Sequence, residues 1–140
     1  MDKISIVSTL RKAKRAHKLW IDRANSLIIG IPIDKDQIPM DHTECAFGKW
    51  YFSDGQELKS YKHFNKIDDY HNDIHRLYRE IFSILFGEEK EKKSFFGRIF
   101  KTKSDTATDK KKLAKIVFVK MKEVSIFLVE EMDQLEKELE

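Results

Sequence analysis

Three long stretches of the chain carry apolar residues at spacings of three and four positions, the period of an α-helix with one buried face. These stretches cover residues 4–29, residues 61–86 and residues from about 109 to 139. A helix with one apolar face is stable when that face packs against other helices. We therefore expect an all-α fold, an antiparallel helical bundle with three long helices.

The apolar stripes predict which residues form the core. Gly30 and Gly87 are expected to end the first two helices, since glycine commonly follows a helix C-terminus. The first stripe consists of Val7, Leu10, Ala13, His17, Trp20, Ile21, Ala24, Leu27 and Ile28. The second consists of Phe64, Ile67, Ile74, Tyr78, Ile81, Phe82 and Leu85, and the third of Leu113, Ile116, Val117, Met121, Val124, Phe127, Leu128, Met132 and Leu135.

The segment between the first two helices contains the only cysteine, Cys45. Pro32 and Pro39 predict a loop that runs to about residue 43, because proline cannot continue a helix. Asp41 or Thr43 is then expected to cap a short helix that carries Cys45 and reaches Trp50. The dipeptide at 54–55, Asp-Gly, predicts a turn.

Length and charge limit the classes of protein to consider. A chain of 140 residues suits a single domain, here 1–140. With 27 basic and 24 acidic residues the net charge is +3, which does not predict binding to nucleic acid. No apolar run reaches the roughly 18 residues that span a membrane, and the N-terminus lacks the apolar core of a signal peptide. We expect a cytoplasmic location.

Three of the five histidines lie on the predicted core faces. His71 and His75 are four positions apart and point the same way, and His17 occupies a core position of the first helix. Together with Cys45 they could form a tetrahedral set of three nitrogens and one sulfur. Each residue also has an ordinary interpretation as a buried core histidine or a small buried thiol. From the residues alone, both interpretations stay open.

The donor set favours zinc among the common metals. It lacks the carboxylates of a diiron bundle, and three neutral imidazoles with one thiolate suit a d¹⁰ ion in tetrahedral geometry. Histidine ligands usually donate their second ring N–H to a carboxylate or a carbonyl. The acidic residues near enough in sequence to accept that bond are Asp41, Glu44, Asp68 and Asp73.

A string of residues around Cys45 resembles the bacterial chemoreceptor zinc-binding domain family. The resemblance consists of a histidine followed three positions later by tryptophan, here His17 and Trp20, the string Cys-Ala-Phe-Gly-Lys-Trp-Tyr at 45–51, and the final His71-Asn-Asp-Ile-His75. It covers about residues 15–78. It implies that His17, Cys45, His71 and His75 are the ligands of one Zn²⁺.

The resemblance also implies a role and partners. Members look like helical bundles that dimerise and sit at the ends of cytoplasmic chemoreceptors or beside diguanylate cyclases. We therefore expect a homodimer, either a stand-alone member or an excised piece, that serves a chemoreceptor or a cyclic-di-GMP signalling protein. Its signal would be zinc availability or the oxidation of Cys45.

We do not expect an enzyme. A set of four protein ligands leaves no coordination position for an activated water, and Asn72 stands where metalloproteases of the His-Glu-x-x-His type carry glutamate. A hemerythrin-like bundle is the alternative metal protein, but it needs more histidines and bridging carboxylates. Trp50 and Tyr51 are expected to pack into the bundle, and Gly48 to permit a close backbone approach or a positive φ.

A basic and aromatic linker at about 88–109 separates the last two long helices. A weak contact with an anionic membrane surface or an acidic partner, as in an adaptor, is one interpretation of this composition. A loop that is disordered or folds back on the bundle is the other. The linker contains the cations Lys92, Lys93, Arg98, Lys101 and Lys103 among Phe95, Phe96, Ile99 and Phe100.

Overall fold

The structure, a computed structural model, describes every residue except 1, 33, 35–37 and 88–106, and its described part contains helices and loops without strands. The expectation of an all-α bundle is confirmed. The elements in chain order are α1 (Lys3–Ile28), α2 (Ala46–Tyr51), the 3-10 helix η2 (Asp54–Leu58), α3 (Lys62–Phe86) and α5 (Ala107–Glu138).

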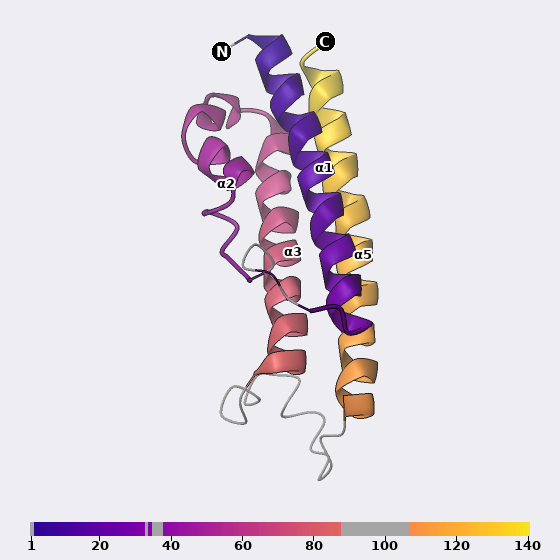
Figure 1. Cartoon of the computed structure of the whole chain (residues 1–140). Coiled ribbons are helices and arrows are strands. Elements are labelled where there is room, and N and C mark those ends of the chain that lie inside the picture. Colours follow the sequence, from indigo (N-terminus) through magenta and orange to yellow (C-terminus); the bar gives the residue numbers. More distant parts are fainter. Residues whose placement is uncertain (1, 33, 35–37, 88–106) are drawn as a thin grey trace.

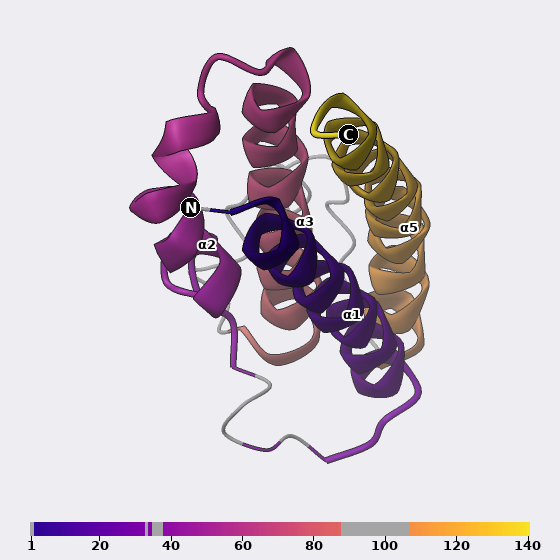
Figure 2. The ribbon, with the colours of Figure 1, turned by 90° about the horizontal axis from the view of Figure 1, so that it is seen from above.

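The three long helices lie side by side, and in the end-on view they form a triangle (Figures 1 and 2). Helix α5 runs antiparallel to α1 and to α3, as expected of an antiparallel bundle. Helices α1 and α3, however, run in the same direction, because residues 29–61 lead the chain back to the end where it began (Figure 1). Helix α2 and η2 lie on this return segment, beside α3.

Both ends of α1 have local signals that fix its length. The Asp2 carboxylate caps the N-terminus by accepting a hydrogen bond of 2.7 Å from the Ser5 N–H. At the other end Gly30 has a φ of 91°, the left-handed conformation that glycine adopts without strain. The N–H groups of Gly30 and Ile31 then bond to the carbonyls of Leu27 and Ser26. The helix ends where the sequence predicts.

One face of each long helix forms the shared core, which includes Leu10, Phe64, Ile74, Tyr78, Met121 and Leu128. Two predicted core residues of α5 are wrong, because Ile116 and Phe127 are exposed. The buried face of α5 follows Ala114, Val117, Met121, Val124 and Leu128, and this single stripe fills the contact with α1 and α3. Ile116 and Phe127 lie outside that stripe, although Phe127 contacts the ring of Tyr70.

The short helix begins differently from the prediction. Cys45 itself is the N-cap of α2, and its Sγ accepts a 3.4 Å hydrogen bond from the Gly48 N–H. Asp41 and Thr43 are therefore not the cap, and the Asp41 carboxylate instead accepts a 2.7 Å hydrogen bond from Arg79. The Asp-Gly pair at 54–55 opens η2.

Most of the predicted linker, residues 88–106, lies outside the described residues. Residues 107–109, which the linker was expected to include, belong to the first turn of α5. In the described parts of the chain no helix has the length and apolar composition needed to cross a membrane.

Candidate metal centre

Four potential metal ligands from three separate segments meet between α1, α2 and α3. They are His17 of α1, Cys45 at the start of α2, and His71 and His75 of α3, and one ligand atom from each lies within 4.8 Å of the others. The three histidines are 0 to 3% exposed, whereas Cys45 is only partly buried. The structure thus brings together all four residues that the sequence singled out.

Backbone carbonyls fix the orientation of two of the histidine rings. The Nδ1 of His17 lies 2.6 Å from the Ala13 carbonyl oxygen, and the Nδ1 of His75 lies 3.0 Å from the Met40 carbonyl oxygen. A carbonyl can only accept, so each Nδ1 carries the proton and each Nε2 carries a lone pair. Both Nε2 atoms are buried with no hydrogen-bond partner among the described residues. These two lone pairs are free to bind a cation.

The third histidine faces the cysteine directly. The Nε2 of His71 lies 3.3 Å from the Sγ of Cys45. In a zinc tetrahedron with bonds of about 2.0 to 2.3 Å, neighbouring ligand atoms are about 3.3 to 3.6 Å apart. All four ligand atoms lie within 4.8 Å of one another, so the most distant of them would move closer by roughly 1 Å to reach one ion. The size of the cluster, its donor types and its two unpartnered Nε2 atoms fit one zinc ion.

Burial sets the protonation states that the four side chains have without a cation. It lowers the pKa of His17 and of His71, and it lowers that of His75 to about 4 even though the Met40 carbonyl opposes the shift. The histidines are thus neutral and able to bind metal at neutral pH. Burial raises the pKa of the Cys45 thiol, against the backbone N–H groups of Gly48 and Phe47. Zinc binding would therefore release a proton from Cys45.

Gly48 lets the chain bend tightly enough to place Cys45. A Cβ at this position would lie 1.8 Å from the carbonyl oxygen of His42, much closer than two such atoms can approach. The expected close backbone approach is confirmed. The alternative of a positive φ is wrong, since among the described residues only Gly30 has one.

The two aromatic residues that follow Gly48 attach α2 to the bundle. Tyr51 stacks on Phe64 with ring centroids 4.2 Å apart, and its hydroxyl donates a 2.9 Å hydrogen bond to the Phe64 carbonyl. Trp50 contacts the rings of Phe47 and Phe64. These contacts orient the segment that carries Cys45, as the sequence predicts.

Three of the four predicted acidic partners of the ligands, all except Glu44, pair with other residues. Asp41 pairs with Arg79, and Asp73 pairs with Arg76 at 3.3 Å. Asp68 lies 3.2 Å from the Nε2 of His42. The ring N–H groups of His17 and His75 bond instead to the backbone carbonyls of Ala13 and Met40. For these two histidines the backbone, and not a carboxylate, accepts the second ring hydrogen bond.

His42 is the residue near the centre that the sequence reasoning missed. Its ring lies 5.5 Å from that of His71, and its carbonyl oxygen is 3.5 Å from the Cys45 Sγ. Its imidazole is directed to Asp68, so it borders the cluster without belonging to it. The sequence contained one signal for this residue. His42 lies three residues before Cys45, and Asp68, its partner, lies three residues before His71.

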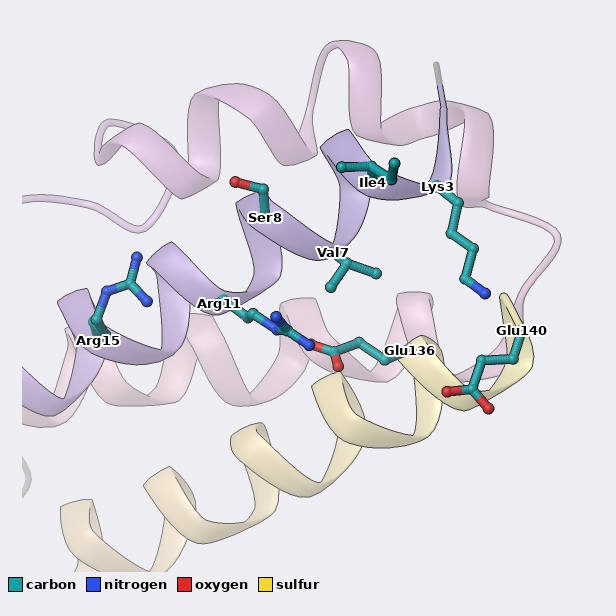
Figure 3. Close-up of a pocket in the computed structure, with 8 residues that line it drawn as sticks. All are labelled: Lys3, Ile4, Val7, Ser8, Arg11, Arg15, Glu136 and Glu140. Carbon is teal, nitrogen blue, oxygen red and sulfur yellow. The ribbon is translucent and has the colours of Figure 1, made fainter.

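A separate pocket lies between the first half of α1 and the end of α5 (Figure 3). It is lined by cations of α1 and by glutamates at the C-terminal end of the chain, and it shares no residue with the metal cluster. Its lining residues are Lys3, Ile4, Val7, Ser8, Arg11, Arg15, Glu136 and Glu140. The metal cluster is thus a buried centre, distinct from this surface hollow.

Fold and site together define a class, helical bundles with a buried centre of three histidines and one cysteine. Residues 17–82 match the model of the family described as the chemoreceptor zinc-binding domain, which confirms the expected resemblance over this part of the chain. No curated protein and no solved structure matches the chain. The matched range begins at His17 and contains the other three cluster residues. Zinc is the metal that both the family and the cluster support.

Proposed function

We propose that the chain is a regulatory zinc domain that binds one Zn²⁺ through His17, Cys45, His71 and His75. The observation that carries this proposal is the pair of buried Nε2 lone pairs, on His17 and His75, held beside His71 and the Cys45 Sγ. With all four ligands supplied by the protein, the zinc coordination is closed. A closed site leaves no position for substrate or activated water, so we propose a role in sensing and no catalysis.

Zinc occupancy itself is the first proposed signal. The ligands come from α1, the segment before α2, and α3, and a bound ion would tie these three segments together. Removing zinc with a chelator should increase amide hydrogen exchange around His17 and Cys45. The His71→Ala variant is the matched control, because chelator should then make no difference. Unchanged protection of the wild-type segments on chelation would contradict this signal.

Oxidation of the ligand Cys45 is the second proposed signal. Cys45 is more exposed than the three histidine ligands, so an oxidant would reach sulfur first. With hypochlorous acid as the oxidant, the thiolate gains the oxygen and becomes a sulfenic acid while chlorine leaves as chloride. A sulfenic acid binds zinc more weakly than a thiolate. Mass spectrometry after one equivalent of hypochlorous acid should find Cys45 oxidised and zinc released, and unmodified Cys45 with retained zinc would contradict the proposal.

The cellular setting is proposed from the family. We propose a single domain over 1–140, since α1, α3 and α5 share one core. We further propose a cytoplasmic homodimer that serves a chemoreceptor or a cyclic-di-GMP signalling protein. The hemerythrin-like alternative has less support, because the cluster formed by the described residues has one cysteine and no carboxylate. The proposed membrane contact falls mainly on residues 88–106, outside the described part of the chain.

A further inference from the structure

Helix α5 carries a second stripe on the side opposite its buried face. The positions of this stripe are four, three, four, three and four residues apart, which is the spacing of a coiled-coil seam. Three of them are large apolar residues with exposed side chains: Ile116 (56% exposed), Val119 (52%) and Ile126 (59%). We name the whole set the outer seam: Lys112, Ile116, Val119, Glu123, Ile126 and Glu130, all of them exposed.

The outer seam does not contribute to packing within the described part of the chain. The contacts of α5 with α1 and α3 use the other side of the helix, through Ala114, Val117, Met121, Val124 and Leu128. Apolar side chains aligned along one exposed helix face commonly mark a contact with another protein. The seam spans 18 residues of rise, or about 27 Å, enough for several layers of a helix pair.

The charges of α5 indicate what would cover the seam. Residues 107–122 contain six lysines and one acidic residue, whereas residues 123–138 contain six acidic residues and one lysine. This order opposes the helix macrodipole, which favours acidic residues at the N-terminus and basic residues at the C-terminus. Stability of the isolated helix therefore does not account for it. An identical helix in the opposite direction would place each charged half beside its complement.

The register of the seam fits that opposite direction. An antiparallel pair can set Ile116 against Ile126 of the other copy, Val119 against Glu123, and Lys112 against Glu130. These are the layers in which an antiparallel coiled coil pairs its two kinds of core position. A parallel pair would instead set Lys112 on Lys112, Glu123 on Glu123 and Glu130 on Glu130. Like charges in direct contact disfavour the parallel pair.

We propose that the outer seam of α5 binds the same seam of a second copy of the chain, antiparallel. The proposal rests on the homodimer proposed above and names its surface and orientation. Helix α5 supplies no ligand to the metal cluster, so the interface and the zinc site are separable.

Charge reversal tests the orientation. Sedimentation velocity on the full chain should detect a dimer. Its dissociation constant should rise about tenfold in each of the two single variants, Lys112→Glu and Glu130→Lys. The double variant should return to within about threefold of the wild type, because the two reversed charges again face each other. A double variant that dimerises no better than the single variants would overturn the antiparallel arrangement. A wild-type chain that stays monomeric at about 100 µM would also overturn it.

An apolar substitution tests the surface. Ile126→Lys should weaken the dimer about 100-fold, whereas Ile4→Lys, at an 83% exposed isoleucine of α1, should leave it unchanged. Equal effects of the two variants would overturn the assignment to α5. Zinc content measured on the same samples separates the proposals. A seam variant that loses the dimer but keeps one zinc per chain supports both, and a zinc-free wild type that still dimerises through α5 contradicts only the proposed zinc function.

Discussion

The contact between α1 and α3 differs in kind from the contact between α3 and α5. At the first, three histidines are buried, and two of their Nε2 atoms have no hydrogen-bond partner among the described residues. At the second, the buried face of α5 is apolar along its length, with Met121, Leu128 and Met132 at 0 to 1% exposure. An unpartnered buried nitrogen costs about 1 to 3 kcal/mol, whereas buried methyl and methylene groups stabilise the fold.

The two contacts therefore have separate sources of stability. The contact of α3 with α5 needs nothing beyond its own side chains. In the proposed zinc-bound form a cation would satisfy the inward nitrogens between α1 and α3, and the same cation would fix Cys45 and the segment before α2. Loss of zinc should therefore loosen α1 and α2 while α3 and α5 stay paired.

The largest effect should come from the apolar contact. Met121→Ala removes a side chain that is fully buried in α5, and it should lower the free energy of unfolding by about 2 to 5 kcal/mol. The loss should be the same with zinc and without it, because Met121 lies on α5, which supplies no residue to the cluster. Chemical denaturation of both forms measures this. A loss confined to the zinc-bound form would show that the two contacts are not stabilised independently.

Gly48→Ala should damage the metal contact selectively. The new Cβ would overlap the His42 carbonyl, so the segment must shift and carry Cys45 with it. We expect a cost of about 3 kcal/mol, seen mainly as weaker zinc binding in competition with a chromophoric chelator. Gly55→Ala is the matched control, since its Cβ would approach Trp50 no closer than 3.0 Å. Equal zinc affinities for the two variants would contradict the role of Gly48.

Acid should destabilise the metal-free protein through the buried histidines. The pKa of His75 is about 4 in the fold and near 6.5 in the unfolded chain, so the unfolded chain binds more protons between these values. Stability is complete above about pH 6.5 and falls as the pH drops toward 4, by roughly 2 kcal/mol at pH 5 for His75 alone. Thermal unfolding from pH 7 to pH 5 measures this. In His75→Gln the stability should depend less steeply on pH. The same pH dependence as in the wild type would contradict the contribution of His75.

The smallest effect should come from the ion pairs that join α1 to α5. Lys14 contacts Asp133, and it lies 3.0 Å from Glu136, on a partly exposed surface. Lys14→Met should change the free energy of unfolding by no more than about 1 kcal/mol, because exposed ion pairs are weak and screened by salt. Denaturation at low and high salt would detect the difference. A much larger loss would mean that these charges, and not the apolar side chains, stabilise the contact between α1 and α5.

Helical periodicity predicted the three long helices and the inward direction of His17, His71 and His75. These features depend on the spacing of residues along one helix, which the sequence states directly. The string that begins at Cys45 added the fourth cluster residue through family resemblance. Gly30 also marked the end of α1 correctly, because its φ follows from local geometry.

The features that the sequence did not predict depend on contacts between distant segments. The ring of His75 is oriented by the Met40 carbonyl, 35 residues away, and no local pattern distinguishes that acceptor from the nearby carboxylates. The exposure of Ile116 and Phe127 depends on which side of α5 meets α1 and α3. Periodicity alone cannot separate two apolar stripes on one helix.

Elemental analysis of the protein purified without added metal tests whether the cluster binds zinc. The wild type and a His63→Ala control, whose histidine pairs with Glu131 outside the cluster, should each contain one zinc per chain. Cys45→Ala and His71→Ala should lose it, because each removes one of the four ligands. A wild-type chain without zinc, or zinc retained in full by both variants, would contradict zinc binding through the four cluster residues.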